Sequence, residues 1–451
     1  MRHQAAGLER YFYVDVNTVY VYSNITAKGL AMHRTERILI KPSDANYSAV
    51  ARICREAKTV HNCANYLMRQ SFFDGKLIPW ATADKLLKRG FSEHPSYSEL
   101  PAVMSQAIIK RIGSDWSGYF SALAEWKKNP GKFKARPRIP GYSKQSKTAI
   151  MPFKDMSCRD GFLIFPKKAE LKSIKVNCCK NQILKAKGDD QIILEIRFVP
   201  HGSCYWLEVV YRLQATDVAG KESVLLDKKK HLSIDLGINN LATLVSDQPG
   251  FYPVLINGRV VKSVNHLYNR DVAKLRSNGH KKQIEAKSVK RFCWINDHFH
   301  KASRLVIQTC LDHDLGTLVI GHNPGWKQAV NIGKVNNQKF VSIPHAKLIE
   351  QIRYKAEEYG IQVIVREESY TSKASALDLD PVPNYDSKSG AKHRFSGRRV
   401  KRGLYQAASG LQLNADVNGA LNILRKEIGD SFLKAVADEG NVFRPKRVTL
   451  R

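Results

Sequence analysis

Hydrophobic and polar residues recur with two different periods along this chain, and the change between them marks its parts. From about residue 46 to 128, apolar positions recur three and four residues apart, which is typical of amphipathic helices with basic outer faces. From about 148 to 226 the pattern changes to short runs separated by Gly, Asn and Asp, which predicts the strands of a small β-barrel. An apolar run at residues 36–41 can join this barrel, so the helical segment is read as an insertion.

The second half of the chain has the pattern of an α/β domain. Residues 231–247 indicate two adjacent strands joined by a turn of Gly and Asn. A basic helical region follows at about 258–313, then a strand at 315–323, a helix at about 345–359 and a strand at 361–368. Strand, helix and strand in this order predict neighbouring parallel strands with a right-handed crossover. Parallel strands end on the same edge, where the sites of α/β domains form.

Three acidic residues stand at the ends of elements in this half. Asp235 follows an apolar strand, Glu368 ends a later strand, and Asp416 lies in the cap or first turn of the last long helix. A buried carboxylate is costly unless something pairs with it, and a divalent metal is one such partner. Two metal ions about 4 Å apart require several shared carboxylates. The alternative for Asp235 is an ordinary cap at a strand end.

Charge and cysteine content narrow the class of protein. The formal net charge of +32 favours a polyanionic partner, of which nucleic acid is the usual one. We see no long apolar segment, lipidation signal or signal-peptide core, so we expect a cytoplasmic protein without membrane contact. The eight cysteines include no CxxC pair, which predicts reduced thiols rather than a disulfide framework or a zinc ribbon.

Residues 127–143 form a basic segment of distinct character, KKNPGKFKARPRIPGYS. Its prolines prevent a helix and stiffen the chain. A stiff basic ribbon with interleaved aromatic residues suits a phosphate backbone and splayed bases, and a surface linker is the alternative. The candidate nucleic-acid contacts in this segment are Lys132, Lys134, Arg136, Arg138 and Tyr142.

Several motifs occur in a fixed order between about residues 231 and 426: SIDLGINNLAT, GHNPGWKQ, NNQKFVSIP, REESYTSKAS, FSGRRVKRGLY and NADVNGALNIL. Together they resemble TnpB, the insertion-sequence-encoded RNA-guided nuclease related to compact type V CRISPR effectors. A weaker collinear resemblance runs from Met32 through KFKARPRIPGY. The resemblance implies a multidomain α+β protein, with a RuvC-like nuclease domain of the RNase H fold and a β-barrel wedge domain that carries an inserted helical recognition domain.

Pattern and resemblance together divide the chain into six parts. These are an N-terminal segment with the first wedge strand (1–45), the helical recognition domain (46–128), the wedge β-barrel (129–226), the first part of the nuclease domain (227–370), a basic insertion that binds target nucleic acid (371–410), and the last part of the nuclease domain with a basic tail (411–451). Many relatives carry a four-cysteine zinc ribbon in the insertion. No cysteine follows Cys310 here and Ser375 stands where one can occur, so we expect no zinc.

The resemblance also assigns the three acids. Asp235 and Asp416 match the first and third RuvC acids. The strand that commonly supplies the second acid ends here in Gly321, His322 and Asn323, without an acid. We therefore assign the second acid to the next strand, to Glu368 with Glu367 as the alternative.

The implied activity is that of an RNA-guided DNA endonuclease with two Mg²⁺ ions. Its partners would be a guide RNA and double-stranded target DNA, recognised through a short target-adjacent motif. Whether one or two chains bind each guide stays open. The alternatives are a nuclease-dead RNA-guided DNA-binding protein that acts as a repressor, and a compact type V CRISPR effector. Further candidate nucleic-acid contacts are Lys301, Trp326, Lys327, Gln328, Arg398, Arg399 and Arg402.

Overall fold

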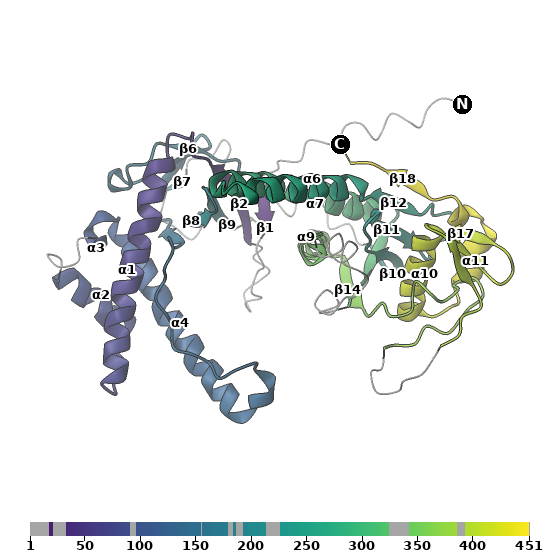
Figure 1. Ribbon diagram of the computed structural model, residues 1–451, viewed down its shortest axis with the longest axis horizontal. Helices are drawn as coiled ribbons and strands as arrows, with labels where there is room; N and C mark the ends of the chain where they lie inside the picture. The colour runs from purple at the N-terminus through teal and green to yellow at the C-terminus, as the bar shows by residue number, and fades with distance from the viewer. Residues whose placement is uncertain are drawn as a thin grey trace. The chain divides into compact units, whose positions relative to one another are not determined.

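The computed structural model describes residues 18–20, 33–90, 96–154, 156–178, 184–185, 193–212, 226–323, 342–385 and 393–450. The chain forms two compact units (Figure 1), one of Asn17–Asp217 and the other of Val218–Arg451 with Met1–Val16. The finer division into six parts stays a prediction.

Helices fill the first part of the unit Asn17–Asp217, as the spacing of apolar residues predicts. They are α1 (Tyr47–Phe73), α2 (Trp80–Arg89), α3 (Ser96–Glu99) and α4 (Ala102–Lys128). Trp116 of α4 anchors the contact between the two long helices, because its ring lies 5.1 Å from that of Phe72 and its Nε1 donates to Asn65 Oδ1 at 3.2 Å. The side chain of Trp116 is buried.

The strands of this unit form two sheets that share one core with the helices. The five-stranded sheet has the order β1 (Thr18–Tyr20), β2 (His33–Ile40), β9 (Cys204–Arg212), β8 (Ile193–His201) and β3 (Ala149–Pro152). The four-stranded sheet has the order β6 (Ile174–Lys175), β5 (Phe162–Ile164), β4 (Ser157–Arg159) and β7 (Leu184–Lys185). Pairing of β2 with β9 confirms that the early apolar run joins strands on the far side of the helical segment. The predicted small barrel corresponds to these two sheets.

A six-stranded mixed sheet is the centre of the other unit. Its order is β14 (Gln362–Arg366), β13 (Leu315–Gly321), β10 (Asp227–Asp235), β11 (Asn240–Ser246), β12 (Val254–Asn257) and β18 (Lys446–Val448). The strands β10, β11 and β12 are antiparallel in turn, whereas β13 runs parallel to β10 and β14 parallel to β13. The predicted hairpin at 231–247 and the predicted parallel pair are therefore confirmed.

Helices cover both faces of this sheet, and the alternation along β10 decides which residue meets which helix. Leu232 and Ile234 pack in the core with α7 (Lys281–Asp312) and α9 (His345–Glu358), and α6 (Arg259–Ser277) packs on α7. On the opposite face, Ser233 Oγ donates to Ala420 O of α10 (Ala415–Ile428) at 2.8 Å. Asp235 has the same parity as Ser233, so it faces α10.

The insertion has more regular structure than its sequence suggests. An antiparallel three-stranded sheet is built from β15 (Arg398–Lys401), β16 (Leu404–Gln406) and β17 (Gln412–Asn414). The sequence pattern of residues 371–410 predicts no regular element, and the structure corrects this for β15 and β16. Strands of three or four residues with exposed basic side chains are too short to give a clear period.

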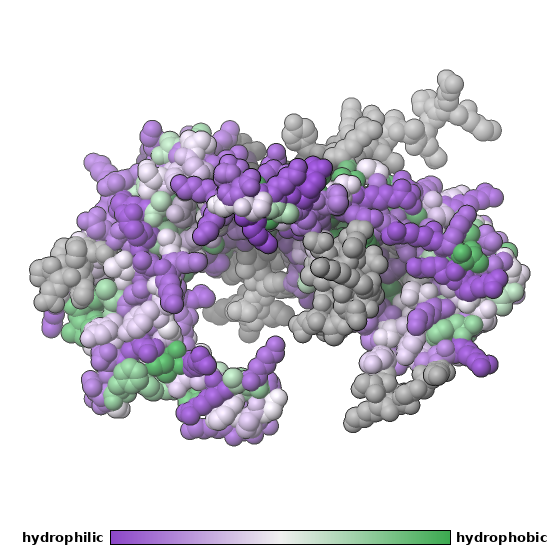
Figure 2. Space-filling view, in the orientation of Figure 1, coloured by the Kyte–Doolittle hydropathy of each residue, from purple (hydrophilic) through white to green (hydrophobic). Residues whose placement is uncertain are grey.

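Polar surface covers much of the protein. Figure 2 shows hydrophilic residues over most of the visible face, including the stretch over α6. No helix in the described ranges combines the length and the apolar character needed to cross a membrane.

Replacement of Trp116 tests the packing of the helical segment. We expect Trp116→Ala to lower the free energy of unfolding by about 3 kcal/mol, because it opens a cavity between α1 and α4. The matched control is Phe120→Ala, since Phe120 lies on the same helix but is 39% exposed, and its effect should stay below about 1 kcal/mol. Urea unfolding followed by circular dichroism measures both, and equal losses would contradict the assignment.

Candidate functional site

Asp235 is the last residue of β10 and lies against α10. Gly419 of α10 leaves the space for it, because a Cβ atom at position 419 would lie 2.9 Å from Asp235 Oδ2. Burial raises the pKa of Asp235 well above its ordinary value. The nearby carboxylates of Asp416 and Glu368 raise this pKa further, and Arg399 offsets part of the rise. Asp235 is therefore crowded by negative charge at the sheet edge.

Asp416 enters the site from the first turn of α10. The helix starts there because the Asn414 side chain caps it, accepting from Asp416 N at 2.9 Å and from Val417 N at 3.3 Å. The Asp416 carboxylate is held on two sides. Asn240 Nδ2 donates to its Oδ2 at 2.7 Å, and a guanidinium nitrogen of Arg399 lies 3.9 Å from its Oδ1.

Glu368 lies two residues beyond the end of β14. Arg366 pairs in register with Gly321 and forms an ion pair with Glu427 of α10, so Glu368 follows on the α10 face. A Cβ atom at Gly321 would lie 3.0 Å from Glu368 Oε2. Asn323 Oδ1 accepts from the Glu368 backbone N–H at 3.0 Å. Burial, and then the neighbouring Glu367, raise the pKa of Glu368 to about 7 against the opposing effect of Lys426.

Glu367, the alternative second acid, forms an ion pair with Lys426. Lys426 Nζ lies 2.6 Å from its Oε2 and also donates to Ser369 O at 3.0 Å. Burial opposes ionisation of Glu367, but hydrogen bonds from Lys426 and Ser369 outweigh it and lower the pKa. Of the two neighbouring acids, Glu368 is the one whose charge acts on Asp235.

The oxygen donors at this edge suit a hydrated divalent cation. Within the described ranges, no three His, Cys, Asp or Glu side chains already surround a common point closely enough to hold a metal ion. Two buried oxygens on β11 lack a hydrogen-bond partner among the residues described, Asn240 Oδ1 and Thr243 Oγ1, and Thr243 is the register partner of Asp235. Crowded carboxylates with unsatisfied oxygens beside them match the hard oxygen ligands and retained waters of Mg²⁺.

The basic ribbon predicted at 127–143 is held to α1 through its backbone. Asn62 Nδ2 donates to Ser143 O at 3.0 Å, and Asn65 Nδ2 and Arg69 donate to Pro140 O at 3.1 and 2.7 Å. The ribbon's candidate side chains are therefore turned to the surface. Lys132 pairs with Glu125 at 2.9 Å, Arg136 lies over Trp126, Arg69 lies over Tyr142, and Lys134 and Arg138 are exposed.

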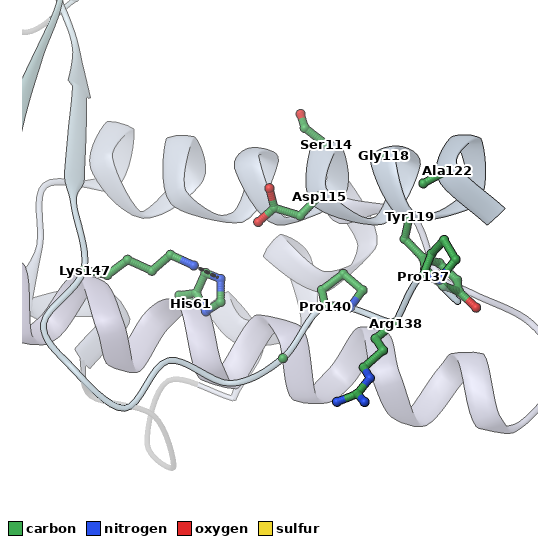
Figure 3. A pocket seen from close by; sticks show the side chains of 11 residues that line it. His61, Ser114, Asp115, Gly118, Tyr119, Ala122, Pro137, Arg138, Pro140 and Lys147 are labelled. Atoms are coloured by element: carbon green, nitrogen blue, oxygen red, sulfur yellow. Dashed lines mark hydrogen bonds between the residues drawn. The ribbon is translucent and has the colours of Figure 1, made fainter. Parts of the chain in front are cut away.

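A cavity of about 510 Å³ lies between α1, α4 and this ribbon (Figure 3). Arg138 lines it, together with Asp115, Tyr119 and a hydrogen-bonded pair of His61 and Lys147. Burial, and then Lys147, lower the pKa of His61. No sequence pattern indicates this cavity, because its lining comes from three separated segments.

The remaining candidate contacts differ in their surroundings. Lys301 pairs with Asp297 on α7 at 2.8 Å. Arg398 is exposed on β15, and Arg402 lies 2.9 to 3.0 Å from the Asn239 amide oxygen in the orientation that satisfies both groups. Arg399 is the basic residue of this hairpin that reaches the carboxylates. Trp326, Lys327 and Gln328 lie outside the described residues.

A hydrogen-bonded clasp, which we define as Ser375, Asp378, Asp380, Ser396 and Ala408, closes the insertion. Asp378 Oδ2 accepts from Ser375 Oγ at 2.6 Å, Ser396 Oγ at 3.2 Å and Ala408 N at 2.7 Å. Asp380 Oδ2 accepts from the backbone N–H groups of Ser375 and Ser396 at 2.8 and 3.0 Å.

A mixed α/β unit with carboxylates at its sheet edge, on a strongly basic chain, is typical of metal-dependent proteins that act on nucleic acid. Two family models match this unit. "Probable transposase" (OrfB_IS605) matches residues 214–327, and "Cas12f1-like, TNB domain" matches residues 345–423.

Two named proteins are similar to this chain in sequence. The chain is 25% identical over 433 residues to "TnpB-like protein ORF457" of Acidianus two-tailed virus, covering 88% of this chain and 87% of the relative. It is 24% identical over 213 residues to the CRISPR-associated endodeoxyribonuclease Cas12f1 of Sulfoacidibacillus thermotolerans, covering 44% and 46% of the two chains. The resemblance to the TnpB family is thereby confirmed, and the protein is a relative of TnpB and Cas12f1 proteins.

Solved structures give a distant likeness. A Cas12f1–sgRNA–target DNA complex aligns with a TM-score of 0.32 at 15% identity, covering 86% of this chain and 98% of the other. A CRISPR–Cas12f ternary complex aligns with a TM-score of 0.33 at 16% identity, covering 83% and 81%.

Lowering the pH tests whether the ionised carboxylate of Asp378 stabilises the clasp. Burial opposes ionisation of Asp378, but hydrogen bonds from Ser375, Ala408, Ser396 and Ser409 lower its pKa below the ordinary value. Its stabilisation is therefore fully present above the unfolded pKa of about 3.9 and is lost as pH falls through the lower folded value. We expect Asp378→Ala to cost about 2 kcal/mol at pH 7, and this difference from wild type should shrink below about pH 4.

The measurement is thermal unfolding of the full chain between pH 7 and pH 3. Asp438→Ala is the matched control, because Asp438 is exposed at the end of α11 (Leu433–Asp438) of the same unit. A difference for Asp378→Ala that persists unchanged at pH 3 would argue against a role of the ionised carboxylate.

Proposed function

We propose that this protein is an RNA-guided DNA endonuclease in which Asp235, Glu368 and Asp416 hold two Mg²⁺ ions. The observation that carries the proposal is the convergence of the three acids. They come from β10, the segment after β14 and the start of α10. A Cβ atom at Gly419 of α10 would lie 2.9 Å from Asp235 Oδ2, and one at Gly321, on the strand next to β10, would lie 3.0 Å from Glu368 Oε2. In agreement, the charges of Asp416 and Glu368 both raise the pKa of Asp235. Concentrating negative charge in this way is unfavourable without a cation.

Strand order supports a RuvC-like domain of the RNase H fold. Three antiparallel strands, β10 to β12, are followed by β13 beside β10 and then by β14, both parallel to β10. The helix α9 connects β13 to β14, and α10 lies on the opposite face of the sheet. In the other unit, the helices between β2 and β3 support a wedge domain with an inserted recognition domain.

Each residue of the site has a separate task in this proposal. Bound divalent ions would supply the charge that activates a water molecule and stabilises the leaving oxygen. Asn323 fixes the backbone of Glu368, and Gly321 and Gly419 leave the space that the carboxylates need. Arg399 offsets part of the negative charge, and its partly exposed guanidinium would contact the DNA backbone.

The partners in this proposal are a guide RNA and double-stranded DNA. The net charge of +32, the exposed basic side chains of the ribbon and the basic hairpin β15–β16 provide surfaces for phosphate contacts. The Cas12f1 relative is by its name a CRISPR-associated endodeoxyribonuclease, which supports DNA as the substrate. Backbone contacts would position the nucleic acid, and base pairing with the guide would select the sequence.

Guided binding without cleavage is the second candidate function. The absence of an acid at Gly321, His322 and Asn323 favours it, because the commoner second acid is missing there. The presence of Glu368 near Asp235 favours cleavage. If the protein binds target DNA stably but does not cut it at ample Mg²⁺, the function is guided DNA binding without cleavage.

Removing the first acid tests the proposed activity. We expect wild-type protein, purified with its RNA, to cut members of a plasmid library, and Asp235→Ala to reduce cutting by about a thousandfold because charge stabilisation at the phosphate is lost. Binding of RNA should be retained, which a filter-binding assay measures. Undiminished cutting by the Asp235→Ala variant would falsify the mechanism.

A pair of neighbouring variants tests the identity of the second acid. We expect Glu368→Gln to abolish cutting to a similar degree, because its carboxylate belongs to the site. Glu367→Gln should retain cutting within about tenfold and instead cost about 1–2 kcal/mol of stability, because Lys426 loses its charged partner. Plasmid cleavage and thermal unfolding separate the two effects, and the reverse pattern would assign the role to Glu367.

A further inference from the structure

Asn240 is a buried residue beside the carboxylates to which the activity gives no role so far. It is the first residue of β11 and is 5% exposed. The turn before it is firmly held, since Gly237 N–H donates to Leu241 O at 3.3 Å and Gly258 N–H donates to Asn239 O at 2.8 Å. Because the backbone on both sides is fixed, the direction of the Asn240 side chain is also set.

The two ends of the Asn240 amide are in different situations. Its Nδ2 donates to Asp416 Oδ2 at 2.7 Å. Its Oδ1 is buried and has no hydrogen-bond partner in the part of the chain that the structure describes. An unsatisfied buried acceptor costs about 1–3 kcal/mol, so its presence needs an explanation. Linking β11 to α10 would require only the Nδ2 end.

Among the residues that the structure describes, no side chain supplies a hydrogen-bond donor to Asn240 Oδ1. The neighbouring carboxylates are acceptors when ionised, and Arg399 is directed at Asp416 Oδ1. Thr243 Oγ1, on the same strand as Asn240, is also buried without a partner. Water is a donor small enough for such a place, and Mg²⁺ keeps several of its waters when it binds to carboxylates.

We propose that Asn240 is a positioning residue of the cation site. Its amide nitrogen holds Asp416 in one orientation, and its amide oxygen accepts a hydrogen bond from an ordered water molecule that hydrates the cation. This inference rests on the proposed function, because it assigns Asn240 to the cation site that the three acids would form. Outer-shell partners of this kind typically contribute 10- to 100-fold to metal affinity.

Binding of Mn²⁺ to the RNA-free full chain tests the proposal without a cleavage assay. Free Mn²⁺ is followed by electron paramagnetic resonance during titration of wild type, Asn240→Ala and Asn240→Thr. Threonine suits a strand and is too short to reach Asp416, so it serves as a second variant. We expect the dissociation constant of both variants to rise by about tenfold or more. Circular dichroism and thermal unfolding establish that the variants are folded.

Asn418→Ala is the matched control for a purely structural asparagine. Asn418 is also fully buried, but both ends of its amide are satisfied, by Ala376 N at 3.0 Å and Ala374 O at 2.7 Å. Its replacement should lower stability and leave Mn²⁺ affinity unchanged. An equal loss of affinity in Asn418→Ala would overturn the special role of Asn240, and so would unfolding of both Asn240 variants while Asn418→Ala stays folded.

Asp235→Ala separates this inference from the proposed function. If Asp235→Ala loses Mn²⁺ binding while both Asn240 variants bind as wild type, the role of Asn240 is wrong and the cation site stands. If Asp235→Ala binds Mn²⁺ as tightly as wild type, the cation site itself fails, and the role of Asn240 fails with it.

Discussion

Repulsion among carboxylates at one sheet edge is the constraint on which the rest of this unit depends. Asp235, Asp416 and Glu368 are brought close enough for burial and mutual charge to raise the pKa of Asp235 and for burial to raise that of Glu368. Such an arrangement stores unfavourable free energy in the cation-free protein. It persists only because a sheet and a helix that are stable for other reasons fix the backbone at all three positions.

Asn240 and Arg399 contact the Asp416 carboxylate directly, whereas the stabilising contacts near Asp235 and Glu368 lie beside their carboxylates. Ser233, one alternation before Asp235, bonds to Ala420 O and ties β10 to α10. Asn414 caps α10, and Lys426 at its far end holds the segment after β14 through Glu367 and Ser369. Most hydrogen-bond donors near the site are thus occupied with backbone or with Glu367. The carboxylates of Asp235 and Glu368 are left for a cation, in agreement with the proposed chemistry.

Sequence reasoning predicted the parts of this structure that depend on repeated burial. The strands β10, β11, β13 and β14 and the long helices have apolar residues at a clear period, and burial of one face enforces that period. Short elements were not predicted, among them β12 and the strands β15, β16 and β17, because a run of four residues or fewer is too short to show a period. The hydrogen bonds of the clasp were not predicted for another reason. Asp378 is joined by single hydrogen bonds to groups up to 30 residues away, and such contacts leave no periodic pattern in the sequence. Likewise, no sequence pattern separates Glu367 from Glu368, because tertiary contacts distinguish them: Lys426 and Ser369 bond to the Glu367 carboxylate, whereas the Glu368 carboxylate lies over Gly321.

The position of Glu368, the second acid in the proposed function, depends on space as well as on charge. Gly321 is the last residue of β13, and its register partner on the adjacent strand β14 is Arg366. Neighbouring strands lie about 4.8 Å apart. Glu368 follows Arg366 by two residues. The Glu368 carboxylate reaches back over Gly321, where an added Cβ atom would lie 3.0 Å from Oε2 and would also collide with Ile423. A side chain at position 321 would therefore require Ile423 to move and the Glu368 carboxylate to shift. In the proposed site, the glycine at position 321 thus provides the room that the Glu368 carboxylate occupies.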